Sequence, residues 1–429
     1  MHRLLIIADD LTGAADCGVA CASQGLNSVV VLGGAGDETD ADILSIDANT
    51  RGLSAEAAAA ETSRLVRRYM GSECLLFKKL DSSLRGNVAA ELAAALAASR
   101  DLAMGGKRIV ALLAPAFPAT GRTTVNGQQL IHGRSPQESE SQRSDRLCCR
   151  SNLSEILRDE GLSSALVDIP TIRSGASTLR NSILRLANEA DVLVCDSETD
   201  HDLYEIASAA MLLGPRTVWA GSAGLAHHLP LAAGIQKVTV SIPDQPLAAG
   251  PTLFVVGSRS AASRRQVELL ADSPDVVTIA ISPQALIDQL ESNVLHDHQL
   301  ELSNALAAGQ DVAVLLTSNP SVETEDAPLL SAALAQLVTH CAHRVGALVA
   351  TGGETARAVL EVWGISQLHL VRELEPGLPI SVTGNWTRRL PVLTKAGSFG
   401  TAQTLLHCGR FLHELNRCST ANLYGEQEA

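Results

Sequence analysis

Two adjacent carboxylates, Asp9 and Asp10, follow the apolar run Leu4–Ala8 and come just before a Thr-Gly turn. Ligands of open α/β sheets bind at the carboxyl ends of the strands, so these side chains stand where chemistry is expected. Either carboxylate could orient a substrate hydroxyl or accept its proton. The alternative interpretation is that Asp10 or Thr12 caps the helix that follows, a role that both residue types favour.

Charged and hydroxyl side chains gather in the segment 78–87, KKLDSSLRGN, which includes Asp81 and Arg85. A further segment, DANTR, ends in Arg51 and also follows an apolar run. An arginine fork suits a carboxylate, and a small polyhydroxy acid needs this mixture of donors and acceptors. Solvated loop side chains are the alternative interpretation. We expect Asp9 and Asp81 to be accessible to solvent at their strand ends, outside the core.

Another cation, Arg122, stands in the segment 114–127, APAFPATGRTTVNG. Two prolines fix the exit from a predicted strand, and Gly-Arg-Thr then presents the guanidinium. A turn alone would also explain these Pro and Gly residues.

Three Gly- and Ser-rich segments follow predicted strands in the second half: VGSRS at 256–260, TGGETA at 351–356 and KAGSFG at 395–400. Together they suggest a cradle of backbone amides for phosphate groups, although each alone could be an ordinary tight turn. Gly353 would let the backbone approach a phosphate closely and adopt a positive φ, next to the positive end of a helix.

Several familiar motifs are absent from the sequence. There is no GxxxxGK[ST] segment, which excludes a Walker-type phosphate loop, and there is no HExxH pair. Gly34-Ala35-Gly36 lacks the third glycine of a dinucleotide fingerprint. His340 and His343 lie on a helical pattern, where packing is favoured over a metal site.

The elements that must carry these segments alternate along the chain, in a pattern typical of mostly parallel, doubly wound α/β sheets flanked by helices. Predicted strands lie at 4–8, 29–32, 43–46, 75–80, 109–113, 165–167, 192–195, 217–220, 253–256, 276–279, 312–316, 347–350 and 392–394. Predicted helices include 14–24, 55–70, 88–99, 177–190, 263–271, 329–343, 354–363 and 402–415. The Pro-rich segment 241–251 is the linker candidate, so we expect two domains, 1–246 and 247–429, with a ligand cleft between them.

The composition and charge of the chain limit the classes of function that it can have. The 429 residues carry a formal net charge of −14 without a basic run, which argues against nucleic-acid binding. Nine cysteines, an odd number without a CxxC pair, are typical of reduced thiols in the cytoplasm. The apolar start halts at Asp9, too early for a signal peptide. No apolar stretch reaches the roughly 18 residues of a membrane span, so no membrane partner is expected.

Taken together, these segments resemble the four-carbon acid sugar kinase family. The resemblance rests on IADDLTGA at 7–14, DANTR at 47–51, KKLDSSLRGN at 78–87, APAFPATGRTTVNG at 114–127, AGSAGLA at 220–226, VGSRS at 256–260, TGGETA at 351–356, EPGLP at 375–379 and KAGSFG at 395–400. The polar stretch 134–150, predicted as an exposed loop, contains ESESQRSD at 138–145, which looks most like the threonate kinase branch.

The resemblance implies a sugar-acid-binding N-terminal domain and a nucleotide-binding C-terminal domain. It implies transfer of the γ-phosphate of ATP, with Mg²⁺, to the terminal 4-hydroxyl of a four-carbon acid. D-Threonate is the expected substrate, with D-erythronate and 3-oxo-tetronate as alternatives. The small-molecule partners are thus the sugar acid and ATP, and a homodimer is one option for the oligomeric state.

Site residues also carry over from the resemblance. The substrate-binding candidates are Asp9, Arg51, Asp81, Ser82, Ser83, Leu84 and Arg85. The nucleotide-binding candidates are Ser258, Gly352, Gly353, Glu354, Thr355 and Gly400. Asp9, Asp10 and Asp81 are the catalytic candidates for taking the hydroxyl proton, Arg51 and Arg85 are candidates for a carboxylate clamp, and the Mg²⁺ ligands are left open.

Two rival functions are weighed against this one. A sugar-acid sensor that binds its ligand without turnover would not need the three Gly- and Ser-rich segments, and all three are present. A nucleotide-dependent oxidoreductase is disfavoured by the incomplete fingerprint at Gly34.

Overall fold

The computed structural model describes residues 2–34, 40–103, 108–135, 150–214, 217–235, 246–288, 292–317, 327–384 and 386–417. The chain forms two compact units, Met1–Thr239 and Val240–Ala429. Most of the polar stretch 134–150 and the first part of the linker candidate 241–251 lie outside the described residues, as do Ala35 and Gly36.

The first unit is built on a parallel sheet. Its strands are β1 (Leu4–Ala8), β2 (Ser28–Leu32), β3 (Ile43–Asp47), β4 (Leu75–Lys79), β5 (Ala111–Ala114), β8 (Ser164–Val167), β9 (Val192–Cys195) and β10 (Val218–Gly221). They lie in the order β2-β3-β1-β4-β10-β5-β9-β8, and every pairing between neighbours is parallel. The helices are α1 (Leu11–Ala22), α2 (Ala55–Tyr69), α3 (Val88–Leu102), α4 (Leu153–Asp159), α5 (Ile169–Ile172), α6 (Ala176–Leu186), α7 (Asp200–Ala210), α8 (Ala223–Ala226) and α9 (Leu229–Ala232).

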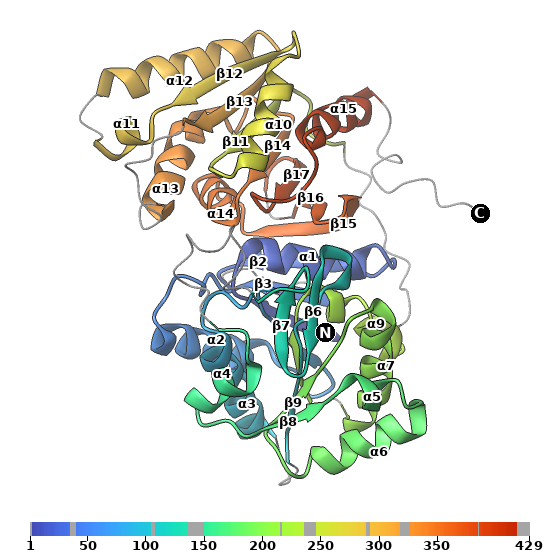
Figure 1. Ribbon diagram of the computed structural model, residues 1–429. Coiled ribbons are helices and arrows are strands. Elements are labelled where there is room, and N and C mark those ends of the chain that lie inside the picture. The colour runs from blue at the N-terminus through green and yellow to red at the C-terminus, as the bar shows by residue number, and fades with distance from the viewer. Residues whose placement is uncertain are drawn as a thin grey trace. The chain divides into compact units, whose positions relative to one another are not determined.

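Strand β1 shows how both faces of this sheet are buried. Leu4 and Ile6 join a core that includes residues of α1, α6 and α7, while Leu5 and Ile7 join a second core with residues of α2 and α3. Figure 1 shows α2, α3 and α4 on one side of the strands and α5, α6 and α7 on the other. Burial on both faces explains why such strands read as continuous apolar runs in the sequence.

The order of the strands reverses around β1, which lies between β3 and β4. The register aligns Ala8 with Asp47 on one side and with Lys79 on the other. The loops that follow β1, β3 and β4 therefore leave the sheet at the same level. Such a switch point is where open α/β sheets bind their ligands.

An antiparallel hairpin, β6 (Arg122–Val125) and β7 (Gln128–Ile131), interrupts the alternation in the first unit. Only a turn is predicted in this segment from the sequence. Asn126 and Gly127 link the strands with φ values of 52° and 71°, and Asn-Gly is a strong signal for a two-residue hairpin loop. The signal was therefore present, although the flanking strands are too short to show a clear alternation.

The second unit also has a mostly parallel sheet. Its strands are β11 (Thr252–Val256), β12 (Val276–Ile281), β13 (Asp311–Leu316), β14 (Ala347–Thr351), β15 (Gln367–Glu375), β16 (Leu378–Thr383) and β17 (Pro391–Lys395). In the order β12-β13-β11-β14-β17-β16-β15, the pairings are parallel up to β17 and antiparallel from there to β15. The antiparallel pair β15–β16 was not predicted from the sequence, although its residues partly alternate between polar and apolar.

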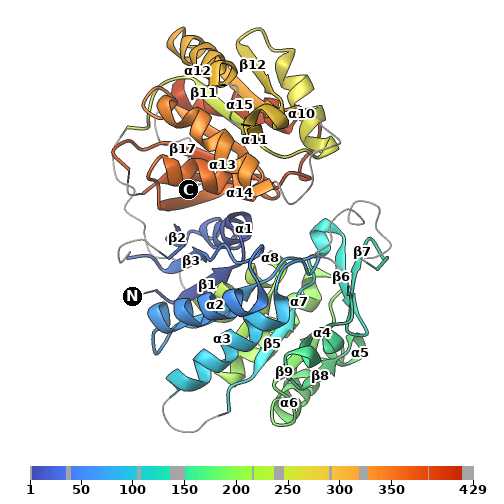
Figure 2. The ribbon, with the colours of Figure 1, turned by 90° about the vertical axis from the view of Figure 1, so that its left-hand side faces the viewer.

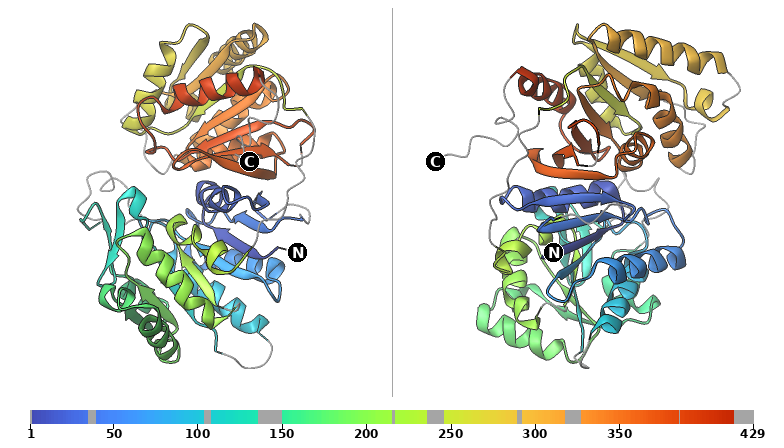
Figure 3. Two further views of the ribbon diagram at one scale, coloured as in Figure 1. Left: turned by 90° about the vertical axis from the view of Figure 1, so that its right-hand side faces the viewer. Right: turned by 180° about the vertical axis from the view of Figure 1, so that it is seen from behind.

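The helices of the second unit are α10 (Ala261–Ala271), α11 (Pro283–Asp288), α12 (Ser292–Ala307), α13 (Ala327–Val338), α14 (Gly353–Val362) and α15 (Thr404–Arg417). Helices α10 and α15 pack on one face, where Leu270 and Leu412 join a core with Phe254 of β11. Helices α13 and α14 face the viewer in Figure 2, and α15 faces the viewer in the left panel of Figure 3, so the sheet is covered on both sides. Both units thus have the α/β class that the sequence predicts. Within the described ranges, every helix is too short or too polar to cross a membrane.

Candidate functional site

Asp9 and Arg51 form the centre of a charged cluster at the end of β1. The Nε of Arg51 donates to Oδ2 of Asp9 at 2.6 Å, and its Nη1 donates to Oδ2 of Asp10 at 2.5 Å. The main chain fixes this arrangement, because the amides of Thr50 and Arg51 donate to the carbonyl oxygen of Asp9 at 3.0 and 3.3 Å. One guanidinium therefore joins two carboxylates.

Asp81 is held in the same cluster by Arg85. The Nε and Nη2 of Arg85 donate to Oδ2 and Oδ1 of Asp81 at 3.0 and 2.9 Å. Oδ2 also accepts from the amides of Ser83 and Arg85 at 3.1 and 3.2 Å. Nη2 of Arg51 lies 3.7 Å from Oδ1 of Asp81, which joins the two halves into one network.

The backbone of the segment from Asp81 to Arg85 is strained at Leu84. Its φ of 61° lies in the left-handed region, which costs a non-glycine residue about 1 kcal/mol or more. Gly86 follows with a φ of 80°, and a Cβ there would lie 3.4 Å from Cγ of Arg51. The turn therefore places Arg85 beside Asp81 and allows the loop to pack against Arg51. Strain of this kind is concentrated at functional sites.

The expectation that Asp9 and Asp81 are accessible to solvent is wrong, because only 2% and 8% of their surfaces are exposed. Burial alone would raise the pKa of Asp9, but the positive charges of Arg51 and Lys79 outweigh it and hold the pKa below its ordinary value. Burial likewise acts to raise the pKa of Asp81, while Arg85 and Arg51 hold it well below the usual range. The paired cations keep both carboxylates ionised inside the protein.

The three carboxylates differ in what their oxygens bind. Asp10 caps α1 by accepting from the amide of Gly13 at 2.7 Å, which confirms the capping interpretation, and its other oxygen accepts from Arg51. Both oxygens of Asp81 accept from Arg85. Oδ1 of Asp9 is buried and has no hydrogen-bond partner within the described ranges. A buried carboxylate oxygen without a donor is rare, so Asp9 is the carboxylate that can receive a ligand hydroxyl.

Two buried lysines of the same segment were not among the site residues predicted from the sequence. Nζ of Lys78 lies 3.4 Å from Oε2 of Glu91 and donates to the carbonyl oxygen of Ile7 at 3.3 Å, so it is a satisfied core residue. Lys79 points to the other face, where a Cβ built on Gly13 would lie 2.8 Å from its Nζ. Because Nζ of Lys79 stands beside the carboxylates, it adds positive charge to the site. The sequence showed both lysines but could not tell which one faces the cluster.

Three loops come together at the carboxyl ends of β11, β14 and β17. The register aligns Val256 with Thr351 and Thr351 with Lys395, so the Gly- and Ser-rich segments leave the sheet side by side. A Cβ on Gly397 would overlap the hydroxyl of Ser258. A Cβ on Gly257 would likewise overlap the hydroxyl of Thr355, which lies in the first turn of α14, just after the middle loop. The loops therefore touch, and only glycine allows this approach.

Side chains donate hydrogen bonds to carbonyl groups of the loop that follows β17. Nζ of Lys395 donates to three of them, including those of Gly397 at 3.3 Å and Phe399 at 3.0 Å. The hydroxyls of Ser260 and Ser263 both donate to the carbonyl oxygen of Gly397 at 2.7 Å. Burial lowers the pKa of Lys395 to about 8. With its carbonyl held, Gly397 keeps an amide that has no hydrogen-bond partner in the described part of the chain.

The N-terminus of α14 is open. Gly352 is its N-cap residue, with a φ of 95°, and no side chain caps the helix, whereas Ser260 caps α10 through the amide of Ser263 at 3.1 Å. A helix start without a side-chain cap, at the positive end of the helix dipole, suits a phosphate. The expectation of a positive φ at Gly353 is wrong, because the chain turns one residue earlier and Gly353 is already helical.

The remaining predicted nucleotide residues lie around the same loops. Glu354 is in the first turn of α14, and the hydroxyl of Thr355 lies 3.1 Å from that of Ser331. Gly400 has a φ of 83° and packs against Thr404. The structure thus brings the predicted residues of the second unit together, and it brings those of the first unit together around Asp9.

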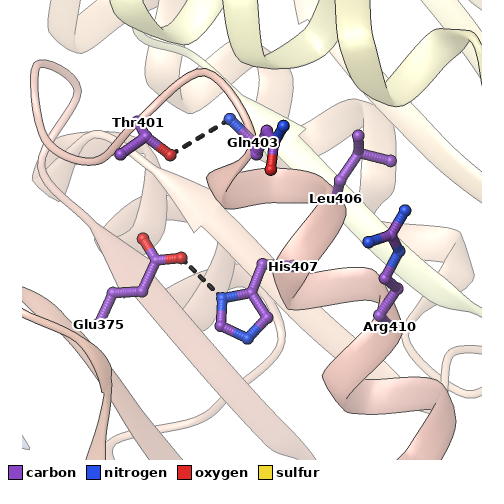
Figure 4. Close-up of a pocket in the computed structure, with 6 residues that line it drawn as sticks. All are labelled: Glu375, Thr401, Gln403, Leu406, His407 and Arg410. Carbon is purple, nitrogen blue, oxygen red and sulfur yellow. Dashed lines mark hydrogen bonds and ion pairs between the residues drawn. The ribbon is translucent and has the colours of Figure 1, made fainter.

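A cavity of about 370 Å³ opens beside Gly400 in the second unit. It is lined by Glu375, Thr401, Gln403, Leu406, His407 and Arg410. Figure 4 shows Glu375 and His407 facing each other, with Nδ1 of His407 2.7 Å from the carboxylate. The hydroxyl of Thr404 holds the second oxygen of Glu375 at 2.7 Å. The cavity therefore adjoins the loop that carries Gly400.

The chain thus has two α/β units, with a charged cluster at the strand ends of one unit and a group of Gly- and Ser-rich loops at the strand ends of the other. Comparison with known proteins agrees with this division. A sugar-binding N-terminal domain family matches residues 4–229, and a nucleotide-binding C-terminal domain family matches residues 253–405.

Curated relatives match nearly the whole chain. A D-threonate kinase of Cupriavidus necator is 38% identical and covers 96% of this chain and 98% of its own. A D-threonate kinase of Bordetella bronchiseptica is 32% identical, covering 95% and 97%. A D-erythronate kinase of Heliobacterium modesticaldum is 28% identical, covering 96% and 97%. The chain belongs to the four-carbon acid sugar kinase family.

Solved structures share the fold. A Salmonella typhimurium protein superimposes with a TM-score of 0.79 at 21% identity, covering 96% of this chain and 99% of its own. A Haemophilus influenzae protein gives a TM-score of 0.70 at 19% identity, covering 96% and 100%.

Proposed function

We propose that this chain is an ATP-dependent kinase that phosphorylates the terminal 4-hydroxyl of a four-carbon sugar acid, with D-threonate as the substrate. One observation carries the proposal above all: the 38% identity to a D-threonate kinase runs over 96% of the chain and so includes both sets of loops. D-Erythronate and 3-oxo-tetronate are the alternative acceptors, because kinases with these names also match.

The proposed acceptor site lies in the first unit, at Asp9, Arg51 and the segment from Asp81 to Arg85. Asp9 takes the proton of the hydroxyl that attacks, since its Oδ1 is the carboxylate oxygen without a donor. Arg51 holds the other oxygen at 2.6 Å and so fixes the direction of Asp9. The cations around Asp9 also offset the negative charge of an approaching acid and phosphate.

The proposed nucleotide site lies in the second unit, at Ser258, at 352–355 and at Gly400. The start of α14, which no side chain caps, suits the phosphates of ATP without a P-loop lysine. Mg²⁺ would be held largely by phosphate oxygens, and Glu354 in the first turn of α14 offers a carboxylate beside them. When bound, the ion neutralises charge on the phosphates, and the protein contributes positioning.

A cytoplasmic location is part of the proposal, because the cysteines of the described residues are free and buried. A homodimer is the assembly we propose to test by small-angle scattering.

A nucleotide and acid panel tests the proposed function. ADP release is measured with ATP-Mg²⁺ and a series of three- to six-carbon sugar acids, and thermal unfolding is measured with each ligand alone. The kinase is stabilised by ATP-Mg²⁺ and releases ADP only with its acid. Stabilisation by NAD(P) in place of ATP would point to an oxidoreductase, and stabilisation by the acid without ADP release would point to a sensor.

A further inference from the structure

The hairpin β6–β7 presents one face to the acceptor site. Thr124 on β6 lies opposite Gln129 on β7, and its Oγ1 donates to Oε1 of Gln129 at 2.7 Å. Nε2 of Gln129 then donates to the carbonyl oxygen of Ser82 at 2.7 Å. The face of the hairpin that carries Thr124 and Gln129 therefore lies against the loop from Asp81 to Arg85.

Arg122 is on the same face of the hairpin. It precedes Thr124 by two residues on β6, and alternate residues of a strand point to one side. Nη1 of Arg122 donates to the carbonyl oxygen of Thr120 at 2.5 Å, which holds the side chain in place. Its Nε is buried and lacks a hydrogen-bond partner among the residues that the structure describes. A buried N–H of a cation without an acceptor is costly, so an acceptor is expected when the site is filled.

The hairpin face that carries Arg122 lies against the loop from Asp81 to Arg85, and the charges of Asp81 and Arg85 act on its guanidinium. Burial lowers the pKa of Arg122, Asp81 acts to raise it, and Arg85 acts to lower it further. The Nε of Arg122 and the free oxygen of Asp9 are the two buried polar atoms without partners among the charged groups of this site.

The guanidinium groups of Arg51 and Arg85, the two predicted clamp residues, already bind carboxylates of the protein. Arg51 binds Asp9 and Asp10 through Nε and Nη1, and Arg85 binds both oxygens of Asp81. A substrate carboxylate could reach them only by displacing a carboxylate of the protein or by crowding beside it. Recognition of the acid therefore calls for a cation that no protein carboxylate occupies.

We propose that Arg122 binds the carboxylate of the sugar acid and selects acids over neutral polyols, an inference that rests on the proposed function. The Nε–H donates to a carboxylate oxygen, in the charge-assisted bond that a guanidinium makes well. Asp9 receives a hydroxyl of the same substrate. Arg51 and Arg85 then act as positioning residues, which hold Asp9 and Asp81 rather than the ligand.

Three variants test this role. Arg122→Met keeps the length of the side chain and removes its charge, and Arg122→Lys keeps the charge but not the fork. Arg134→Met is the matched control, because Arg134 is an exposed arginine just after the same hairpin. Circular dichroism and thermal unfolding establish that each variant is folded before its ligands are measured.

The measurements are the Kd of D-threonate and of ATP by calorimetry, and the Ki of threitol, the neutral polyol of equal length. Arg122→Met should weaken the binding of D-threonate about 50-fold. The Ki of threitol and the Kd of ATP should stay within about twofold of their wild-type values. Arg122→Lys should recover part of the loss, and Arg134→Met should change nothing. Equal weakening of D-threonate and threitol, or no weakening of either, overturns the assignment.

The same variants separate this inference from the proposed function. If the wild-type protein binds a longer or shorter sugar acid instead, and Arg122→Met weakens that acid alone, the four-carbon substrate is wrong and the role of Arg122 stands. If wild type binds D-threonate and Arg122→Met binds it equally well, the role of Arg122 is wrong and the substrate stands. If wild type binds no sugar acid at all, both are overturned.

Discussion

Gly397 lies directly against Ser258, so that a Cβ added to Gly397 would overlap the Ser258 hydroxyl. The contact joins the loop after β17 to the loop after β11. Gly397→Ala should push these loops apart and weaken the binding of ATP at least tenfold. Binding groups must be held within about 0.5 Å of their productive positions, and the amides of the loops would lose that alignment. The Kd of D-threonate, which binds the other unit, should not change. Calorimetric titration of both ligands into the folded variant provides the measurement.

Gly409→Ala is the control for that substitution. Gly409 is inside α15, and a Cβ there would make an ordinary contact of 3.5 Å with the ring of Phe254. Alanine should stabilise the helix by about 0.5–1 kcal/mol and leave ATP binding unchanged. If Gly397→Ala also binds ATP normally, the loop after β17 does not belong to the nucleotide site.

Arg51→Ala should damage both stability and the acceptor site. It leaves Asp9 buried beside Asp10 without the cation that joins them, and breaking a buried ion pair costs about 3–5 kcal/mol. The KM for D-threonate should rise strongly, whereas ATP affinity should stay close to wild type. Urea unfolding and steady-state kinetics measure the two effects.

Arg67→Ala supplies the comparison, because Arg67 is an exposed arginine that forms an ion pair with the exposed Asp101 and a hydrogen bond to Ser63. Removal of an exposed pair should change stability by less than about 1 kcal/mol. Similar losses in Arg51→Ala and Arg67→Ala would show that the buried network is not a special feature of the site.

Asp9→Asn should lower kcat by about 100-fold or more, the range of a lost general base. The positive charges of Arg51 and Lys79 hold the pKa of Asp9 below its ordinary value, so the wild-type carboxylate is ionised throughout the neutral range. The rate of the wild-type enzyme should therefore show no loss from this group between pH 8 and pH 5. A pH–rate profile with an acidic limb in that window, or a kcat of wild-type size in Asp9→Asn, would assign the proton to another group.

Asp81 should make stability depend on pH in acid. Arg85 and Arg51 hold its folded-state pKa well below the unfolded value of about 3.9. A lowered pKa contributes stability that is complete above the unfolded value and is lost as the pH falls toward the folded value. The wild-type free energy of unfolding should therefore fall by about 1 kcal/mol more per pH unit below pH 4 than that of Asp81→Asn. Urea titrations at several acidic pH values compare the slopes, and parallel slopes would show that Asp81 gains nothing from its partners.

The parallel strands and the loops at their ends could be predicted from sequence because both signals are local. Continuous apolar runs mark buried parallel strands, and a polar or Gly-rich segment just after each run marks the edge where ligands bind. Asp9, Arg51 and Asp81 were found this way, and the register of β1, β3 and β4 explains why they meet. The same reasoning grouped Ser258 with Gly352 and Gly400.

What the sequence could not provide depends on contacts between distant segments. Burial of Asp9 and Asp81 follows from their pairing with Arg51 and Arg85, which no single segment reveals. The role proposed for Arg122 depends on a hairpin that folds back onto Ser82 through Gln129. The shift of the positive φ from Gly353 to Gly352 is a matter of one residue in the start of α14, a scale that sequence patterns do not resolve.

The proposed reaction can be checked by identifying the product formed from ATP-Mg²⁺ and D-threonate. Phosphorus NMR and mass spectrometry identify the ester, and an enzyme-coupled assay counts the ADP. D-Threonate 4-phosphate and ADP should form in equal amounts, with a lower kcat/KM for D-erythronate and 3-oxo-tetronate. ADP formed at the same rate without the acid, or phosphate attached at a position other than the 4-hydroxyl, would contradict the proposed reaction.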